Sequence, residues 1–564
     1  MLSAPSSEVN VVLGGEAGHG LQTVGLVLAR AAVAGGLHLM VVNEFMSRIR
    51  GGSNSTYLRL SPQPVRAFSD RVDCCVLFDR DALDRLSGRC TATTLLVGDP
   101  EVFGQRPDIL PLPLRELGVR AGGALLANSV VCGFLVRLLG WEMAPLQTAL
   151  RRTFAEDDIL AQNLEAARSG WEAGAAEHGR FALPTRSAPT GRRLLLDGSQ
   201  SVALGTLAGG CTFVSSYPMS PATGVLVHLA KQAGVHGLVV EQAEDEISAI
   251  NMGLGAWYAG AQALVTTSGG GFDLMAEGMS LCGAIESPLV VHLAQRPGPG
   301  TGLPTRTEQG DLEIARYSGH GEFPRAILAP GSPEEAFACA AHAFAMADAS
   351  QSPVIVLTDQ YLLDSLCDLD PPPLPATPPT ARIVATAPDY RRYAPGPDGI
   401  SPRGIPGHGA GLVCVDSDEH DEEGRITEEF AVRTAMVDKR LAKFRPLRHE
   451  LALPPSLHGP ADYRRLLIAW GSTGPAIVEA LARVPLARTA LLHCVQIYPL
   501  PAVLDRYLRR AERIIVIENN ATGQFARLLR GETGCGIADQ WLKYNGLPFS
   551  VEEITALLRK EEQR

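Results

Sequence analysis

The feature that most constrains the fold is a repeated alternation of short apolar runs, glycine- or proline-rich turns and helical stretches. In the first block, Val9–Leu13 is followed by a glycine loop and then by a helical pattern over Leu21–Ala34. A second block repeats this order over residues 192–364, and a third does so over residues 465–558. Short apolar runs between helices are typical of parallel strands covered on both faces. The sequence therefore predicts an α/β protein with three doubly wound parallel-sheet domains.

Two loop-rich stretches separate these blocks. The segment Pro184–Gly191 contains two prolines and few apolar residues, and residues 370–462 contain the run PPPLPATPP and the acidic run Asp416–Glu423. Clustered prolines cannot maintain a helix or a strand ladder, so the longer stretch is predicted to be structureless and either functional or wrapped around a partner. The predicted divisions are domains over residues 1–185, 192–368 and 463–564, with a linker and its acidic loop over 369–462.

Composition narrows the class of protein. A chain of 564 residues is too long for one hydrophobic core. Its 50 basic and 61 acidic residues give a net charge of −11 without a basic stripe, which makes nucleic acid a poor partner. The first residues do not resemble a signal peptide and no long apolar run is present, so we expect a cytoplasmic protein without a membrane span. The 11 cysteines form no C-x-x-C pair, so we expect no metal site and no iron–sulfur cluster on this chain.

A glycine loop follows the first predicted strand. Gly15, Gly18 and Gly20 lie between that strand and a helix, where backbone N–H groups and the helix dipole favour an anion. Their spacing is not G-x-G-x-x-G, so the dinucleotide fingerprint is absent. The loop is either a tight turn or a phosphate or coenzyme contact. The arginines of Arg48–Gly52 either add positive charge to the same crevice or belong to a solvated loop.

The segment Tyr217–Thr223 follows a strand of the second block. Pro218 and Pro221 fix the backbone on either side of the Ser220 hydroxyl, at the sheet edge where open α/β folds bind ligands. The alternative is a capped helix start, with Ser220 as the N-cap and Pro221 as the first helical residue.

Four carboxylates, which include Glu244, Asp245 and Glu246, lie at the end of the next strand and the start of a helix predicted over Ala243–Tyr258. Acidic residues in a first helical turn are usually explained by the helix dipole. The rest of this helix is small or apolar on nearly every side, so we expect it to be buried. A carboxylate that enters a buried helix needs a partner, and a ligand base is a good candidate.

Two further strand ends carry polar or glycine-rich segments. Ser268, Gly269, Gly270 and Gly271 would let a planar ligand or another subunit approach the backbone closely. The loop Gln295–Arg306 carries two arginines and two threonine hydroxyls on a rigid Pro/Gly frame, and arginine suits bidentate recognition of a carboxylate. Four such strand ends in one predicted sheet indicate a ligand site.

These motifs, in this order, resemble the 2-oxoacid:ferredoxin oxidoreductases. The resemblance is to the larger subunit of two-subunit members, with a gamma-type domain fused ahead of the alpha domain, and it is nearest to the 2-oxoglutarate type. It spans nearly the whole chain and is carried by IRGG near residue 50, YPMSPA, VVEQAEDEISAINMGLGAWYAG, TTSGGGFDLMAEG, QRPGPGTGLPTRTEQGDL, GISPRGIPG and DSDEHDEEGRITEE. Ser220, Gly270 and Asp273 stand where the family usually has Thr, Pro and Ser, which leaves the substrate range open.

The resemblance implies a central domain that binds the pyrimidine end of thiamine diphosphate and a third domain like the transketolase C-terminal domain. The cofactor would be shared with a small (beta) subunit that carries the diphosphate site, Mg²⁺ and a 4Fe-4S cluster, in a dimer of heterodimers. Ferredoxin would dock mainly on that subunit, and coenzyme A would be the co-substrate. The reaction implied is oxidative decarboxylation of a 2-oxoacid, 2-oxoglutarate above all, to acyl-CoA and carbon dioxide, or the reverse carboxylation.

The resemblance also implies roles for individual residues. Glu246, or else Glu244, would be the carboxylate that contacts the pyrimidine. Arg296 would pair with the substrate carboxylate, and the hydroxyls of Ser220 and Thr305 would bind the substrate end. Other contacts to the cofactors would come from Tyr217, Pro218, Ser268, Gly269, Gly270 and the glycine loop.

Two other classes of function remain open at this point. One is a thiamine-dependent decarboxylase or transketolase-like enzyme without a redox step, and reduction of a low-potential acceptor during turnover would separate it from the first interpretation. The other is a nucleotide-binding regulatory protein built on the glycine loop, which would bind nucleotide without thiamine.

Overall fold

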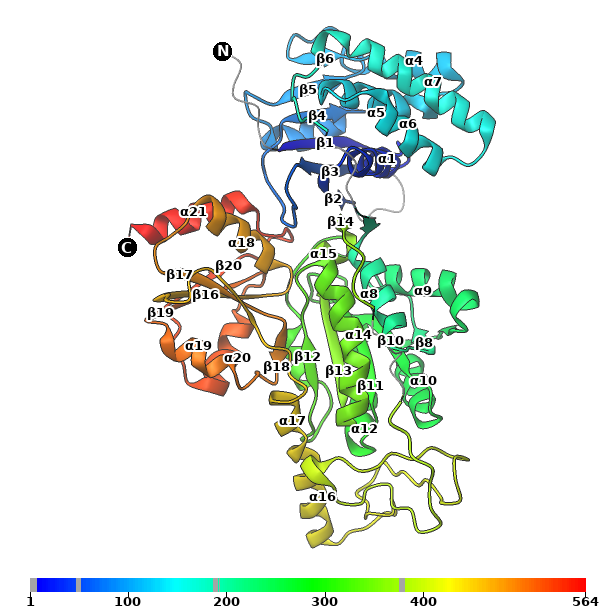
Figure 1. Ribbon diagram of the computed structural model, residues 1–564, viewed down its shortest axis with the longest axis vertical. Coiled ribbons are helices and arrows are strands. Elements are labelled where there is room, and N and C mark those ends of the chain that lie inside the picture. Colours follow the sequence, from blue (N-terminus) through cyan, green and yellow to red (C-terminus); the bar gives the residue numbers. More distant parts are fainter. Residues whose placement is uncertain (1–7, 47–51, 186–190, 192, 375–380, 564) are drawn as a thin grey trace. The chain divides into compact units, whose positions relative to one another are not determined.

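The computed structural model describes residues 8–46, 52–185, 191, 193–374 and 381–563 (Figure 1). The chain divides into two compact units. One comprises residues 1–197, 364–371 and 550–556, and the other comprises the rest. The first contains one sheet and the second contains two, so the predicted α/β class with three sheets is confirmed.

The sheet of the first unit has the order β6-β5-β4-β1-β3-β2-β14-β7. Its strands are β1 (Val9–Glu16), β2 (His38–Glu44), β3 (Ser53–Ser61), β4 (Cys74–Leu77), β5 (Leu95–Gly98), β6 (Ile109–Pro111), β7 (Leu194–Leu196) and β14 (Leu366–Leu369). The half from β1 to β6 is parallel, as predicted. The other half is antiparallel, because β3 pairs with both β1 and β2 and because β14 pairs with both β2 and β7. The polar residues of β3 gave no strand signal in the sequence.

Helices pack against this sheet around a core of buried aliphatic residues. Helices α5 (Ala127–Leu138) and α7 (Asp157–Ala173) lie in close contact because Gly133 and Gly170 each face the backbone of the opposite helix, where a side chain would overlap a carbonyl group. The helices are α1 (Leu21–Ala34), α2 (Arg80–Leu86), α3 (Pro100–Phe103), α4 (Leu114–Ala121), α5 (Ala127–Leu138), α6 (Met143–Thr153) and α7 (Asp157–Ala173).

The central sheet of the second unit has the order β18-β12-β13-β11-β10-β8-β9. Its strands are β8 (Phe213–Ser216), β9 (Val239–Gln242), β10 (Ala263–Ser268), β11 (Leu289–Gln295), β12 (Ala326–Leu328), β13 (Pro353–Asp359) and β18 (Gln496–Tyr498). All neighbours are parallel except β12 and β18. After β8 the chain adds β9 on one side, and it then continues on the other side with β10 and β11. The strand order therefore reverses between β8 and β10.

Helices cover both faces of the central sheet, and α14 lies across β11 and β13 (Figure 1). The helices of this part are α8 (Gly198–Ala208), α9 (Thr223–His236), α10 (Glu246–Tyr258), α11 (Gly269–Leu274), α12 (Ala276–Ala284), α13 (Leu312–Tyr317), α14 (Pro333–Ser350) and α15 (Gln360–Asp364). The sequence pattern located β10 and β11, whose apolar runs are completely buried, and the helices α8, α10 and α12. It did not locate α9, α13, α14 or α15.

The third sheet has the order β15-β17-β16-β19-β20, parallel except at β15. Its strands are β15 (Ser456–His458), β16 (Arg465–Trp470), β17 (Thr489–Cys494), β19 (Arg513–Glu518) and β20 (Asp539–Leu542). The associated helices are α18 (Thr473–Arg483), α19 (Leu504–Arg510) and α20 (Gln524–Thr533), whereas α21 (Val551–Glu562) is divided between the two units. Its apolar residues join those of the central sheet in one continuous core.

The described part of the linker, residues 369–374 and 381–462, is not structureless. It contains α16 (Phe430–Ala442) and α17 (Phe444–Arg448), drawn in yellow in Figure 1. Buried ion pairs hold it against the central domain: Glu286 contacts Lys439 at 2.7 Å and Lys443 at 2.6 Å, and Asp348 contacts Arg403 at 2.6 Å. The acidic run is also engaged, because Glu419 accepts hydrogen bonds from Arg433 and Arg440. Pairings this distant in sequence leave no local pattern, which explains why the prediction failed.

Among the described residues, no single helix has both the length and the apolar character needed to cross a membrane. The strongly bent pair formed by Leu114–Ala121 and Ala124–Leu138 meets the criteria of length and composition only when its two helices are taken together. The same part of the chain contains no group of three or more His, Cys, Asp or Glu residues arranged to hold a metal ion.

Candidate functional site

The predicted site residues gather at the carboxyl ends of β8, β10 and β11, beside the reversal of strand order. Tyr217 follows β8, Ser268 ends β10, and Arg296 follows β11. In open α/β sheets, ligands bind in the crevice at such a switch point. The acidic segment follows β9, which pairs parallel to β8, so the fold brings all four predicted strand ends to one edge by topology alone.

Arg296 and the Tyr217–Thr223 segment are in direct contact. The guanidinium Nη1 of Arg296 donates a hydrogen bond to the backbone oxygen of Ser220 at 2.8 Å. The backbone carbonyl of Ser220 therefore has a hydrogen-bond donor, and Ser220 itself is exposed at the edge of the sheet. Ser220 is not a helix cap, because α9 begins at Thr223 and its N-cap residue is Ala222. That alternative from the sequence is wrong.

The acidic strand end separates into residues with different environments. Asp245 is the N-cap of α10 and accepts a hydrogen bond from the backbone N–H of Ser248 at 2.7 Å. Glu244 is exposed, whereas Glu246 is only 3% exposed and its buried Oε1 has no hydrogen-bond partner in the described part of the chain. A buried oxygen without a partner costs about 1–3 kcal/mol. Among Glu244, Asp245 and Glu246, it is therefore Glu246 whose buried oxygen needs a hydrogen-bond donor from a ligand.

Helix α10 is buried on one side only, so the prediction of a fully buried helix is wrong for this chain. Ile250 and Trp257 are completely buried, whereas the side chains of Ile247, Met252 and Tyr258 are 48%, 38% and 37% exposed. Apolar side chains on the open side explain why the sequence pattern suggested burial all round.

The turn from Ser268 to Gly271 places two carboxyl groups against its backbone. A methyl group on Gly269 would lie 2.6 Å from Oδ2 of Asp311, and one on Gly271 would lie 2.5 Å from Oε1 of Glu246. Gly270 between them faces open space. The Oγ of Ser268 is buried and, like these two carboxyl oxygens, has no hydrogen-bond partner among the described residues. Two of the three glycines thus make room for carboxyl groups of the chain itself.

The loop after Arg296 is anchored by buried amide side chains. Gln295 accepts a hydrogen bond from the backbone N–H of Asp311 at 3.0 Å, and Gln309 bonds to the carbonyl of Trp470 and to the backbone N–H of Asn519. Gly302 closes a tight turn in which any side chain would overlap the carbonyl of Pro297. Thr305 occupies a half-buried position on this loop. Gln295 and Gln309 were not singled out in the sequence, because isolated glutamines form no motif.

Asp311 also escaped the sequence prediction. Burial raises its pKa to about 7, and the carboxylates of Glu308 and Asp273 act in the same direction, whereas the charge of Arg296 opposes them. Burial lowers the pKa of Arg296, and the charge of Asp311 counteracts that change. No ion pair joins Arg296 to a carboxylate of the described residues, so its guanidinium keeps donors available for an anionic ligand.

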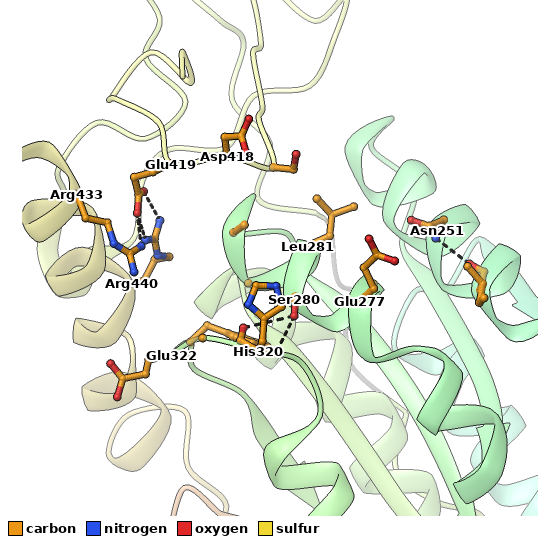
Figure 2. Close-up of a pocket in the computed structure, with 17 residues that line it drawn as sticks. Asn251, Glu277, Ser280, Leu281, His320, Glu322, Asp418, Glu419, Arg433 and Arg440 are labelled. Carbon is orange, nitrogen blue, oxygen red and sulfur yellow. Dashed lines mark hydrogen bonds and ion pairs between the residues drawn. The ribbon is translucent and has the colours of Figure 1, made fainter. Parts of the chain in front are cut away.

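A separate cavity of about 560 Å³ lies on the open side of α10 and α12 (Figure 2). Ile247 and Asn251 of α10, Glu277 of α12 and Glu322 contribute to its walls, and Arg433 and Arg440 on α16 are already paired with Glu419. No residue predicted for the site lines this cavity, although Ile247 directly follows Glu246.

In the first unit, most of the glycine loop is occupied by contacts with neighbouring residues of the same unit. The backbone N–H of Glu16 donates to Asp79 at 2.6 Å and to the ring of His19 at 3.0 Å. A side chain on Gly15 would meet that ring, and one on Gly20 would overlap Asn128, so both glycines are explained by internal packing. Gly18, with a φ of 101°, faces open space and leaves room for a ligand. Arg48, Ile49, Arg50 and Gly51 lie outside the described residues.

The chain is similar to known proteins over nearly its whole length. Residues 204–439 match the thiamine diphosphate-binding model of the pyruvate flavodoxin/ferredoxin oxidoreductases, and residues 10–173 match the pyruvate ferredoxin/flavodoxin oxidoreductase model. The chain is 30% identical to subunit alpha of 2-oxoacid:ferredoxin oxidoreductase 2 from Aeropyrum pernix, over 98% of this chain and 97% of that protein. The chain belongs to the 2-oxoacid:ferredoxin oxidoreductase family.

Other members of this family support the assignment. The chain is 29% identical to the 2-oxoglutarate oxidoreductase subunit KorA of Mycobacterium tuberculosis, over 98% of this chain and 91% of that subunit. A solved 2-oxoglutarate:ferredoxin oxidoreductase from Magnetococcus marinus, with 2-oxoglutarate, coenzyme A and succinyl-CoA bound, superposes with a TM-score of 0.93. That match has 28% sequence identity and covers 99% of this chain and all of the other. The resemblance recognised in the sequence is confirmed.

The described residues fit one end of thiamine diphosphate. The stretch that matches the thiamine model contains every predicted site residue of the central domain. At the sheet edge where these residues gather, Oε1 of Glu246, Oγ of Ser268 and Oδ2 of Asp311 are buried and have no hydrogen-bond partner among the described residues. Buried polar atoms normally have a partner in the functional protein. An aminopyrimidine ring offers both donors and acceptors, which is the chemistry that these oxygens require.

Proposed function

We propose that this chain is the alpha subunit of a 2-oxoglutarate:ferredoxin oxidoreductase, which converts 2-oxoglutarate and coenzyme A to succinyl-CoA and carbon dioxide and passes the electrons to ferredoxin. The observation that carries the proposal is the superposition, over 99% of the chain, on an enzyme of that activity with substrate and product bound. The same chemistry can run in reverse as a carboxylation.

The roles of individual residues follow from their environments. Glu246 would accept a hydrogen bond from the aminopyrimidine of the cofactor, because its Oε1 is buried without a partner among the described residues, whereas Glu244 is exposed to solvent. Ser268, Gly269 and Gly270 would line the same ring, with Tyr217 and Pro218 at the neighbouring strand end. Thiamine diphosphate, when bound, supplies the electron sink for loss of carbon dioxide.

Arg296 would hold the carboxylate of the 2-oxoacid. One of its N–H groups is spent on the carbonyl of Ser220, which fixes the plane of the guanidinium and leaves further donors for a bidentate contact. The hydroxyls of Ser220 and Thr305 would hydrogen-bond to the substrate end.

The remainder of the site would come from a partner. A small subunit would provide the diphosphate and Mg²⁺ site, carry the 4Fe-4S cluster and receive ferredoxin, in a dimer of heterodimers. The exposed apolar side of α10, with Ile247, Met252 and Tyr258, would pack against that subunit, together with the rim of the cavity in Figure 2. Gly18 and its neighbours would be the contact of the first unit with coenzyme A.

The proposal is tested by reconstitution with the small subunit and a panel of 2-oxoacids. We expect reduction of ferredoxin that depends on coenzyme A and is fastest with 2-oxoglutarate. In that assay Glu246→Gln should lose about 10²–10⁴-fold in kcat, the usual contribution of a positioned proton-transfer group. Glu244→Gln is the matched control and should retain activity. A dead Glu244→Gln beside an active Glu246→Gln would move the role to Glu244, and turnover without acceptor reduction would refute the redox function.

A further inference from the structure

The third sheet has a reversal of strand order of its own, between β16 and β19. After β16 the chain adds β17 on one side, and it then continues on the other side with β19 and β20. In an open α/β sheet, the crevice at the carboxyl ends of two such strands is where a ligand usually binds. The crevice between β16 and β19 is therefore the place in this sheet that a ligand would occupy.

The side chain of Gln309 fills this crevice, and it comes from the loop between β11 and α13 (residues 296–311). Its Nε2 donates to the carbonyl of Trp470, the last residue of β16, at 2.9 Å. Its Oε1 accepts from the backbone N–H of Asn519, directly after β19, at 2.8 Å and from the hydroxyl of Thr473 at 3.0 Å. Gln309 is completely buried, so its amide stands where a polar ligand would bind.

The backbone of Gln309 is held at the same place. Its N–H donates to the carbonyl of Asn519 at 2.7 Å, and its carbonyl accepts from the side chain of Asn520 at 3.1 Å. Gly471 follows β16 with a φ of 56°, and a side chain there would lie 2.7 Å from Nε2 of Gln309. The turn after β16 is therefore shaped to admit this glutamine.

Two further contacts hold the loop on either side of this glutamine. The side chain of Gln524 donates to the carbonyl of Gly310 at 2.7 Å, and the backbone N–H of Thr307 donates to the carbonyl of Gly546 at 3.1 Å. The third sheet and its connections thus fix the stretch from Thr307 to Gly310. Thr305 lies two residues before that stretch, so a shift of the stretch reaches Thr305 along the backbone.

We propose that the third sheet holds the substrate-binding loop in place and that Gln309 is the positioning residue through which it does so. This inference rests on the proposed function, since Arg296 and Thr305 on this loop would bind the 2-oxoacid. Gln309 positions rather than catalyses, because its amide is bonded to the third sheet and would touch neither substrate nor cofactor. The crevice of that sheet then binds a part of the chain itself instead of a ligand.

Gln309→Met tests this role, because methionine keeps the length of the side chain and removes its hydrogen bonds. Thr305 would lose its position, so KM for 2-oxoglutarate should rise by about tenfold, the usual effect of one lost hydrogen bond to a charged group. kcat should change little, because Thr305 would hold the substrate equally in the ground state and the transition state. A purely structural role would lower the amount of folded enzyme, and with it the apparent kcat, but would leave KM unchanged.

Gln496→Met is the matched control. Gln496 is also buried, and its amide donates to the carbonyls of Leu447 and Pro499 and accepts from the backbone N–H of Leu453. Both variants therefore lose three side-chain hydrogen bonds, but Gln496 holds the linker and not the loop. We expect similar losses of unfolding free energy in the two variants and a raised KM in Gln309→Met alone.

Thr473→Val provides the readout if Gln309→Met fails to fold. It removes one donor to Gln309 from the side of the third sheet, so KM should rise in the same direction by about threefold, the effect of one neutral hydrogen bond. Thr473→Ser keeps the hydroxyl and should keep the wild-type KM.

Hydrogen–deuterium exchange of the full-length chain tests the anchoring of the loop without turnover. In Gln309→Met, peptides that cover residues 300–313 should exchange faster than in the wild type, because the loop opens locally more often. In Gln496→Met, faster exchange should instead be found in peptides of the linker around residues 446–453.

The outcomes separate this inference from the proposed function. Unchanged exchange over the loop in Gln309→Met overturns the anchoring. A wild-type KM in both Gln309→Met and Thr473→Val, or an equal rise of KM in Gln496→Met, overturns the positioning role while the enzyme activity stands. Faster exchange over the loop together with no turnover of any 2-oxoacid overturns the proposed function and, with it, the effect assigned to KM.

Discussion

Replacing Gly271 by alanine tests whether the position of Glu246 matters. The added methyl would lie 2.5 Å from Oε1 and 2.8 Å from Cγ of Glu246, and it would also overlap the hydroxyl of Thr267. Thr267 is fixed in the buried strand β10, so Glu246 must move by roughly 1 Å to restore van der Waals distance, and a displacement of that size can cost about 10²-fold in rate. We expect kcat to fall by about that factor.

The effect on stability should be small by comparison. Crowding of this kind costs about 1–3 kcal/mol, and alanine recovers about 0.5–1 kcal/mol relative to glycine within a helix. Gly270→Ala is the matched control, since the adjacent methyl would meet no atom within 4 Å. It should not lower the unfolding free energy measured in denaturant, and kcat should fall far less than in Gly271→Ala. Equal kcat values for the two variants in the ferredoxin-reduction assay would refute the argument that Gly271 positions a catalytic Glu246.

Three further predictions concern other parts of the chain. Arg296→Lys keeps the charge but loses the planar fork, so kcat/KM for the 2-oxoacid should fall by a factor that corresponds to about 2–4 kcal/mol, with cofactor binding retained. Wild-type kinetics for Arg296→Lys together with impaired kinetics for Arg306→Lys would reassign the carboxylate contact to Arg306. Glu286→Gln leaves Lys439 and Lys443 without their carboxylate, so it should cost about 3–5 kcal/mol in unfolding free energy and speed proteolysis of the linker. The lysines hold the pKa of Glu286 at about 2, below its ordinary 4.5, so this stabilisation should disappear as the pH falls from 4.5 to about 2. If the wild type and Glu286→Gln gave identical acid-unfolding profiles, the predicted loss of stability would be contradicted. The isolated chain should be colourless, contain no iron and reduce no acceptor until the small subunit is added; stoichiometric iron, or full activity alone, would rule out a shared site.

The central sheet was predictable because its strands have uniform apolar runs and its ligand-facing residues follow those runs directly. Every residue of β11 is buried, and the predicted helix over Ala243–Tyr258 ends at the same residue as α10. It begins three residues later than predicted because Asp245 caps it with its side chain. Strand ends placed in the right order sufficed to bring Ser220 and Arg296 together, since parallel strands share one carboxyl edge.

The linker and the mixed half of the first sheet could not be predicted for a different reason. The backbone of Glu286 has a φ of 49°, and its carboxylate meets lysines more than 150 residues further along the chain. Strand β14 joins β2 across an even longer separation, with Leu366 paired to Val41. Neither contact leaves a periodic signal, because each is formed by a few residues that only the tertiary fold brings together.

The glycines of the segment Ser268–Gly271 were predicted to belong to the site, but the reason for two of them differs from the one predicted. Its glycines were expected to admit a planar ligand or a second subunit, yet Gly269 and Gly271 admit Asp311 and Glu246 of the same chain, and only Gly270 faces open space. Three buried oxygens therefore meet at this segment, on Ser268, Glu246 and Asp311, without hydrogen-bond partners among the described residues, at a cost of about 1–3 kcal/mol each. A ligand that satisfies them recovers this free energy on binding. Substitution at Gly269 or Gly271 should thus impair the site through the carboxyl groups, whereas substitution at Gly270 should act only through direct contact with what is bound.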